Sequence, residues 1–257
     1  RRQRQMGIRD RPQASDISSE AAVVMENTTN TILYSKNADE VLFPGSTVKI
    51  MTCFLALENT QLTDEVTMTA TGVSGVTDGG ASISSQVDEV FTVEQCLYAI
   101  MVASANDIAL QIAEHVGGSV DGFVQQMNTR AQELGCTNTV FTNPTGLPDD
   151  NQHTTAHDMA LIMQAAIQNE SFRTIAAATS YTIPATNKAA ARNLTSKFTM
   201  TDTGSTGFYE GCIGGKEGYT EASGSTLVCA AQRNGMTLIS VVLKGASGQT
   251  VVSYTHL

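Results

Sequence analysis

Two residues in one apolar run have the types and the spacing for nucleophilic catalysis. Between Glu40 and Glu58 the chain reads VLFPGSTVKIMTCFLAL, in which Lys49 is the only charged residue. Ser46 precedes Lys49 by three positions, so on a helix the two side chains share a face and can exchange a proton. A buried lysine without a carboxylate partner has its charged form disfavoured and can act as a base near neutral pH. Such a base enables a serine hydroxyl to attack a carbonyl group.

The element that positions this pair is expected to be a buried helix. The residues from Ser46 to Leu57 are apolar on almost every side, which is typical of a helix inside a core, and Pro44-Gly45 supplies a turn before it. We expect the helix to begin near Ser46, where free N–H groups and the positive dipole end favour an oxyanion. In the alternative interpretation Ser46 caps the helix and Lys49 extends to solvent.

A second segment, Ser104-Ala105-Asn106, lies between TVEQCLYAIMVA and DIALQIAEHV, which both have helical apolar spacing. It is therefore predicted to join two helices. In a structural interpretation these residues and Asp107 cap a helix. In a functional one, the Ser104 hydroxyl passes a proton between Lys49 and the leaving group. The Asn106 amide then holds the substrate backbone or fixes Lys49.

The third segment, Lys216-Glu217-Gly218, lies in the run CIGGKEGYT, which leads into a hairpin. STLVCAAQ and MTLISVVL are apolar strand-like runs, and Asn234-Gly235 between them favours a tight two-residue turn. Glycines on the leading strand let another chain approach its backbone, so a bound peptide can lie along it. The alternative is a glycine-rich edge strand with a solvated lysine.

Together the three segments resemble the signature of the active-site serine penicillin-recognising enzymes. From about Ala21 to about Gly245 the chain is similar to the D-alanyl-D-alanine carboxypeptidases of the low-molecular-mass penicillin-binding protein family. The likeness includes the opening hairpin AAVVMENTTNTILYSK and the loop and helix FTNPTGLPDDNQHTTAHDMALIMQAA. It implies an α/β (α+β) fold of the β-lactamase/transpeptidase type. In that fold an antiparallel sheet is flanked by helices and meets an all-helical subdomain, here roughly 65–170, at the active site.

The resemblance also implies a role for each residue of the three segments. Four residues would carry out the chemistry: Ser46, Lys49, Ser104 and Asn106. Four would bind the substrate: Lys216, Glu217, Gly218 and Tyr219. Ser46 would be the nucleophile that forms the acyl-enzyme, Lys49 its base, and Lys216 the ligand of the terminal carboxylate of the peptide. The N–H groups of Ser46 and Tyr219 would form the oxyanion hole.

Glu217 departs from the family pattern. The family usually has threonine at this position, and its hydroxyl helps to bind the terminal carboxylate. A glutamate there sets like charge against like charge, a repulsion that grows in a partly dry cleft. We expect Glu217 either to turn away from the site or to pair with a basic group.

The resemblance implies a serine-type carboxypeptidase that removes the terminal D-alanine from peptidoglycan stem pentapeptides, with β-lactams as covalent inhibitors. One alternative is a degenerate domain that binds peptidoglycan or penicillin without turnover, which Glu217 alone supports. The other is a class A-like β-lactamase. It is disfavoured because the second segment reads Ser-Ala-Asn rather than Ser-Asp-Asn and because no counterpart of the deacylating glutamate is found.

Composition and other motifs limit the partners. A chain of 257 residues that is 41% hydrophobic can bury one core with a subdomain, and its net charge of −10 argues against a nucleic-acid partner. His153 and His157 have a spacing that can bind zinc, but HTTAH lacks the glutamate of zinc peptidases, so we expect neither metal nor cofactor. Thr154-Thr155 more simply caps a helix from Ala156.

The five cysteines are interpreted by their surroundings. Cys53 and Cys96 lie in apolar helical runs and are expected to be small buried hydrophobes. Cys212 and Cys229 flank the third segment, and a disulfide between them is an alternative that we do not favour.

Both ends of the chain resemble translated sequencing-adapter sequence. Residues 1–11 and 252–257 are therefore excluded from fold reasoning. The catalytic domain is expected to span 12–251 and to be truncated at its C-terminus. Family members are exported, so an extracytoplasmic location is expected, secreted or associated with the cell membrane. Many members also carry a C-terminal amphipathic helix that rests on the membrane, so membrane contact would be made only by segments missing from this fragment. Nothing in the fragment itself approaches a transmembrane length.

Overall fold

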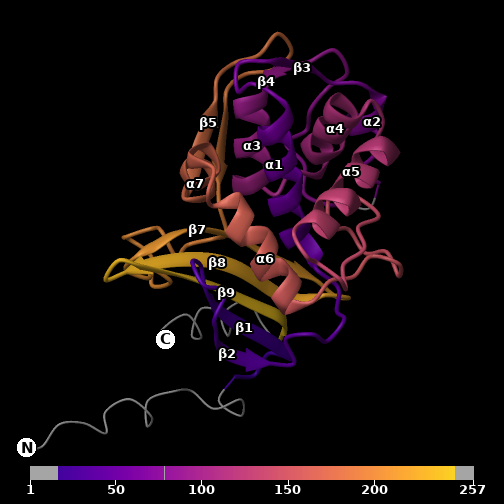
Figure 1. The fold of residues 1–257 in the computed structure, drawn as a ribbon. Coiled ribbons are helices and arrows are strands. Elements are labelled where there is room, and N and C mark those ends of the chain that lie inside the picture. The colour runs from indigo at the N-terminus through magenta and orange to yellow at the C-terminus, as the bar shows by residue number, and fades with distance from the viewer. Residues whose placement is uncertain (1–16, 78, 247–257) are drawn as a thin grey trace, which may run out of the picture.

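A five-stranded antiparallel sheet is the platform on which the other elements are built (Figure 1). The computed structural model describes residues 17–77 and 79–246, and the strand order is β2-β1-β9-β8-β7. The strands are β1 (Ala21–Glu26), β2 (Ile32–Lys36), β7 (Cys212–Thr220), β8 (Gly224–Arg233) and β9 (Met236–Gly245). Because β1 pairs with β9, the first hairpin of the chain lies beside the last. An antiparallel sheet flanked by helices is the predicted fold class, which is confirmed.

The helices form a layer on one side of the sheet and extend away from it (Figure 1). They are α1 (Val48–Asn59), α2 (Ala70–Val73), α3 (Val93–Val102), α4 (Asn106–Gly117), α5 (Val120–Glu133), α6 (Ala156–Ala166) and α7 (Glu170–Ala176). Two short ribbons border them: β3 (Glu65–Thr67) with β4 (Val90–Thr92), and β5 (Ser180–Ile183) with β6 (Arg192–Thr195). Within the predicted subdomain range 65–170, α6 packs directly on β1, β8 and β9. The limits of that subdomain stay a prediction.

Both faces of the sheet are covered. Successive side chains of a strand point to opposite faces, and each face packs against its own hydrophobic cluster. Val228 and Val241 belong to the large core shared with the helices, whereas their neighbours Leu227 and Val242 belong to a smaller cluster. Phe198, from the segment that leads from β6 to β7, is buried in that second cluster. Burial of both faces explains why the predicted strand runs are almost continuously apolar rather than alternating.

The hairpin of β8 and β9 forms as its sequence predicts. Arg233 pairs with Met236 across the turn, and Asn234 and Gly235 have φ angles of 52° and 75°. Both values lie in the left-handed region that a type I′ turn requires. The turn fixes the register of the two strands that support β7.

The buried helix predicted from the apolar run is α1. Every residue from Val48 to Ala56 is buried. The helix is entered through a 3-10 turn at Gly45–Thr47, so the α-helical part begins two residues later than expected. Ser46 makes no capping hydrogen bond there, and the interpretation of Ser46 as a helix cap is not supported.

The helix-to-helix junction at residues 103–105 also forms as predicted, between α3 and α4. Thr92 and Gln95 form a reciprocal capping box at the start of α3, with distances of 3.0 and 3.1 Å. The predicted cap at the start of α6 forms too, because the Thr155 hydroxyl accepts a hydrogen bond from the Asp158 N–H at 3.0 Å.

The cysteines are free thiols. Cys53 and Cys96 are each 1% exposed, as expected of buried hydrophobes, and Cys212 and Cys229 are not joined. Burial raises the pKa of the Cys53 thiol to about 12. The thiol therefore stays protonated at neutral pH, although it lies one helical turn after Lys49.

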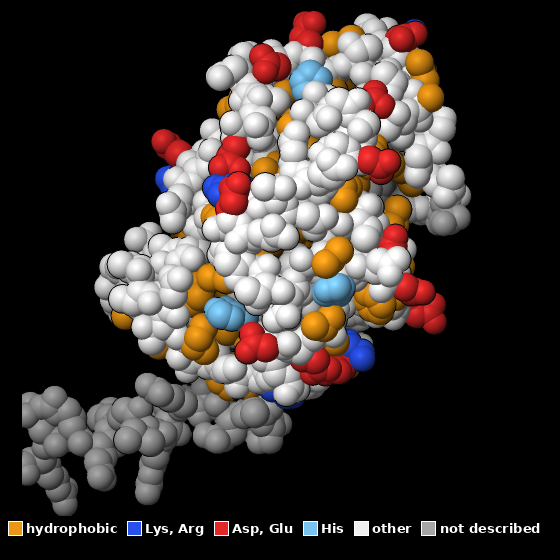
Figure 2. Space-filling view, turned by 45° about the vertical axis from the view of Figure 1, so that its right-hand side comes forward, with side chains coloured by type: hydrophobic (Ala, Val, Ile, Leu, Met, Phe, Trp, Pro, Cys, Tyr) orange, Lys and Arg blue, Asp and Glu red, His pale blue; other side chains and the backbone are white. Residues whose placement is uncertain are grey.

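Acidic side chains are spread over the face of the molecule seen in Figure 2, with few basic ones among them, in keeping with the net charge of −10. No helix in the described part of the chain is long and apolar enough to cross a membrane. Residues 1–11 and 252–257 lie outside the described residues, so the domain limits 12–251 stay a prediction.

One buried ion pair joins the two ribbons. The Glu89 side chain is fully buried, and the Arg192 guanidinium donates to both of its oxygens at 2.9 Å. Arg192 also donates from Nε to the Ile83 carbonyl at 3.0 Å. Burial by itself raises the pKa of Glu89, but hydrogen bonds from Arg192 and Thr186 outweigh it and hold the pKa below its usual value. The pair therefore ties β6 to the segment before β4.

Arg192→Met should lower the free energy of unfolding by about 3 kcal/mol, because it leaves the Glu89 carboxylate buried without its cation. Urea unfolding at pH 7 measures this loss. Glu89→Gln added to Arg192→Met should recover part of it, whereas the exposed Lys188→Met is the control that leaves the midpoint in place. Because the pKa of Glu89 is lowered, the stabilisation is full above about pH 5 and is lost as the pH falls through the folded-state value.

Candidate active site

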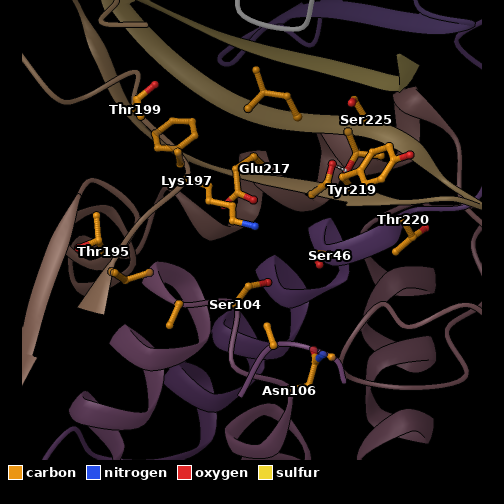
Figure 3. A pocket seen from close by; sticks show the side chains of 18 of the residues that line it. Ser46, Ser104, Asn106, Thr195, Lys197, Thr199, Glu217, Tyr219, Thr220 and Ser225 are labelled. Carbon is orange, nitrogen blue, oxygen red and sulfur yellow. Dashed lines mark hydrogen bonds between the residues drawn. The ribbon is translucent and has the colours of Figure 1, made fainter. Parts of the chain in front are cut away.

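The three segments singled out in the sequence meet at one cleft of about 570 Å³ (Figure 3). Its lining includes six of the predicted site residues: Ser46, Ser104, Asn106, Glu217, Gly218 and Tyr219. The 3-10 turn before α1, the α3–α4 junction and β7 supply them. The other two, Lys49 and Lys216, are buried, with exposed fractions of 1% and 0%.

Lys49 lies directly behind Ser46. Its Nζ atom is 3.5 Å from the Ser46 Oγ and donates a hydrogen bond to the Thr145 carbonyl at 2.5 Å. Burial, and then the positive charge of Lys216, hold the pKa of Lys49 well below its ordinary value, while the negative charge of Glu217 acts in the opposite direction. A neutral amine in this position can donate to Thr145 and still offer its lone pair to the serine proton.

The Thr145 carbonyl is a contact of Lys49 that the sequence analysis missed. It is presented by a tight turn in which the Asn143 Oδ1 accepts hydrogen bonds from the N–H groups of Thr145 at 3.2 Å and Gly146 at 2.8 Å. Gly146 has a φ of 84°, and a Cβ there would lie 2.0 Å from the Gly45 carbonyl oxygen. The run Asn-Pro-Thr-Gly carries the signal for such a turn, but not for its contact with Lys49.

Gly218 lets β7 pass against the 3-10 turn that carries Ser46. A Cβ at this position would lie 2.9 Å from the Ser46 Cβ and 3.0 Å from the Ser46 N. The backbone of β7 is thereby held beside the N–H of Ser46. This proximity is needed if the N–H groups of Ser46 and Tyr219 form an oxyanion hole, which stays a prediction. The Tyr219 side chain is 67% exposed and lines the cleft.

Ser104 adopts a backbone conformation that non-glycine residues rarely take. Its φ is 55°, and in Figure 3 its side chain points into the cleft. The N-cap position of α4 is Ala105, and no side chain caps this helix. A strained residue that serves no cap is typical of a functional position. Asn106 lines the same wall at 4% exposure, and its Oδ1 has no hydrogen-bond partner among the described residues.

Asp107 has a tertiary role rather than the capping role proposed from the sequence. Its carboxylate is 1% exposed and accepts hydrogen bonds from the Ser85 hydroxyl at 2.6 Å, the Ser85 N–H at 3.2 Å and the Ile83 N–H at 3.3 Å. These bonds hold the segment before β4 against the start of α4. Gly80 and Ala81 at the beginning of that segment line the cleft.

Glu217 pairs with a basic group, which is one of the two outcomes expected for it. The Lys216 Nζ donates to the Glu217 Oε1 at 2.9 Å and to the Glu217 carbonyl at 2.9 Å. Glu217 does not turn away, since its side chain is 23% exposed and lines the cleft. The lysine predicted to bind the substrate carboxylate therefore already has a carboxylate partner.

The histidines form no metal site in this region. The His157 Nδ1 lies 3.5 Å from the Asp39 Oδ1, and His153 pairs through its backbone with Val140. Within residues 17–77 and 79–246, no group of three or more His, Cys, Asp or Glu side chains is arranged to hold a metal ion.

Comparison with known proteins identifies the class. The sequence profile of the D-alanyl-D-alanine carboxypeptidases, peptidase family S11, matches residues 8–247. The chain therefore belongs to this family of serine peptidases.

Individual relatives agree with this placement. The chain is 36% identical over 247 residues to the D-alanyl-D-alanine carboxypeptidase DacF of Bacillus subtilis (strain 168), covering 93% of this chain but only 60% of that relative. It is 32% identical over 240 residues to the D-alanyl-D-alanine carboxypeptidase of Streptomyces sp. (strain K15), covering 90% and 82%. The crystal structure of the Streptomyces K15 DD-transpeptidase matches with a TM-score of 0.86 and 30% identity over 95% of both chains.

If Lys49 is the base, Lys49→Arg should suppress acylation by a penicillin as thoroughly as Lys49→Met, by at least about a hundredfold. The reason is that a guanidinium keeps its proton at every working pH. Rapid-mixing kinetics with a fluorescent penicillin measure the acylation rate. An arginine variant that acylates at close to the normal rate would show that Lys49 serves only as a positive charge.

Glu217→Gln should move the acid limb of the acylation rate to lower pH. The Glu217 charge raises the pKa of Lys49, so its removal lowers that pKa and leaves the amine neutral further into the acid range. Acylation rates measured across the pH range test this shift. Glu65→Gln, at an exposed residue of β3, is the control for the change in net charge. The prediction is contradicted if the acid limb of the acylation rate moves to higher pH in Glu217→Gln, or if it moves equally in Glu65→Gln.

Proposed function

We propose that this chain is the catalytic domain of a serine-type D-Ala-D-Ala carboxypeptidase that acts on peptidoglycan stem pentapeptides through an acyl-enzyme on Ser46. The observation that carries the proposal is the buried Lys49 amine, 3.5 Å from a serine hydroxyl at the wall of the cleft. Membership of the S11 family supports the same reaction class.

In the proposed reaction Ser46 Oγ attacks the carbonyl carbon of the bond between the two D-alanines, and its proton passes to the Lys49 Nζ. The N–H groups of Ser46 and Tyr219 stabilise the oxyanion. The Ser104 hydroxyl passes a proton to the departing nitrogen, and D-alanine leaves. Asn106 holds the substrate backbone. Water then cleaves the ester and restores the Ser46 hydroxyl.

The cleft suits an extended peptide. β7 is the outer strand of the sheet on this side, so one of its edges has no strand partner in the described part of the chain. A substrate backbone can add to that edge as a further strand, with Lys216, Glu217 and Gly218 along its length. The position of Ser46 beside Gly218 brings such a peptide to the nucleophile.

The substrate class fixes where such an enzyme works. Peptidoglycan lies outside the cytoplasmic membrane, so we propose an extracytoplasmic location, either secreted or held at the membrane by other segments. The partners proposed are the stem peptide as substrate and β-lactams as covalent inhibitors, with no nucleic acid.

One observation favours a second candidate, a domain that acylates and then fails to turn over. Glu217 occupies the usual threonine position and pairs with Lys216. The two candidates differ in the release of D-alanine from a stem pentapeptide, which only the carboxypeptidase performs repeatedly. A β-lactamase would instead hydrolyse the penicillin at a steady rate.

A fluorescent penicillin should label Ser46 covalently, because the β-lactam ring presents a carbonyl that the same hydroxyl attacks. Gel fluorescence followed by mass mapping of peptides locates the label. Ser46→Ala should abolish labelling with the urea midpoint unchanged, since Ser46 makes no capping hydrogen bond. A label on another residue, or none on folded protein, would overturn the proposed function.

A further inference from the structure

The described lining of the cleft contains two charged side chains, Glu217 and Lys197. Figure 3 shows them on the same side of the cavity, near the end that is bounded by β7. Lys49 and Lys216 also lie close by, but both are buried behind the wall. Among the described residues that line the cleft, Lys197 is therefore the cation that an anionic group entering from solvent can reach.

Lys216 is poorly placed to receive that anion. Its ammonium is fully buried and donates to both the carboxylate and the carbonyl of Glu217. The Glu217 carboxylate also stands in the lining of the cleft, where a substrate carboxylate would repel it. An ion pair has little attraction for a third charge, because the two opposite charges nearly cancel beyond the length of the pair.

The residues on either side of Lys197 are buried, and Lys197 itself lines the cleft. Ser196 and Phe198 are 9% and 3% exposed, and the Phe198 N–H donates to the Ser196 hydroxyl at 3.0 Å. Phe198 packs on β7 so closely that a Cβ at Gly215 would lie 2.8 Å from its ring. Between these two buried residues Lys197 is exposed and extends over the cleft (Figure 3).

Lys197 also has a free charge. Its ammonium forms no ion pair or hydrogen bond with any residue in 17–77 or 79–246. A cation at the rim of a concave site concentrates anions there and can form a charge-assisted hydrogen bond with a carboxylate.

We propose that in this chain Lys197, rather than Lys216, supplies the positive charge that receives the carboxylate of the substrate or of a β-lactam. Glu217 neutralises the charge of Lys216. The residue that recognises the carboxylate of the ligand therefore lies in the segment between β6 and β7. The inference rests on the proposed function and adds to it a specificity-determining residue.

The test compares a penicillin with its methyl ester, which carries the same reactive ring without the carboxylate. Lys197→Gln should lower the second-order acylation rate about tenfold for the acid, the loss of one charge-assisted contact, and leave the ester within about twofold. Lys197→Arg should keep most of the rate with the acid. Lys188→Gln, at an exposed lysine outside the cleft, is the matched control and should change neither rate. The proposal would be overturned if Lys197→Gln lowered the acylation rate equally for the acid and the ester, or did not lower it for the acid.

A double variant tests the link to Glu217. Glu217→Thr frees Lys216, so in that background Lys197→Gln should cost much less than in the wild type. The same tenfold loss in both backgrounds would show that Glu217 does not determine the role of Lys197. Failure here is distinct from failure of the proposed function, because the wild-type protein must first be labelled on Ser46. If labelling succeeds and Lys197→Gln behaves as wild type, only the inference about Lys197 falls.

Discussion

The burial of the Lys49 amine is the interaction on which the site depends. Removing an ammonium from water is costly unless an anion accompanies it, and the deprotonated form is favoured instead. At this position the chain supplies a backbone carbonyl, that of Thr145, as the nearest acceptor. A carbonyl accepts a hydrogen bond without adding a full negative charge, so it orients the amine and leaves it basic. The serine hydroxyl at 3.5 Å is then in reach of a base.

Several parts of the fold hold this arrangement in place. The apolar length of α1 keeps water from Lys49, and the turn at residues 143–146 brings the Thr145 carbonyl to it. Gly45, Gly146 and Gly218 have no side chains that would separate this turn, Ser46 and β7. Lys216 adds positive charge that lowers the pKa of Lys49 further, and Glu217 reduces that effect. Glu217 therefore affects the pKa of Lys49 as well as the charge of the cleft wall formed by β7.

Local patterns in the sequence predicted much of this structure. The run around Lys49 predicted α1, and the Asn234-Gly235 pair predicted the hairpin behind β7, because each depends on neighbouring residues alone. The contact of the Thr145 carbonyl with Lys49 could not be predicted, since the two residues are 96 positions apart and the Asn-Pro-Thr-Gly run signals only the turn. Lys197 was missed for a related reason. A single lysine in a polar run has no distinguishing pattern until the fold places it on a cleft.

The pairing of β1 with β9 has a consequence for how the chain folds. Sheets closed by strands from opposite ends of a chain form late, since the loop between them must be ordered first. β7, which carries Lys216 and Glu217, pairs with β8, so the surroundings that lower the pKa of Lys49 are complete only once this hairpin has formed. If Ser46 and Lys49 act as proposed, folding itself completes the nucleophile, and a partly folded copy should not be acylated at this position.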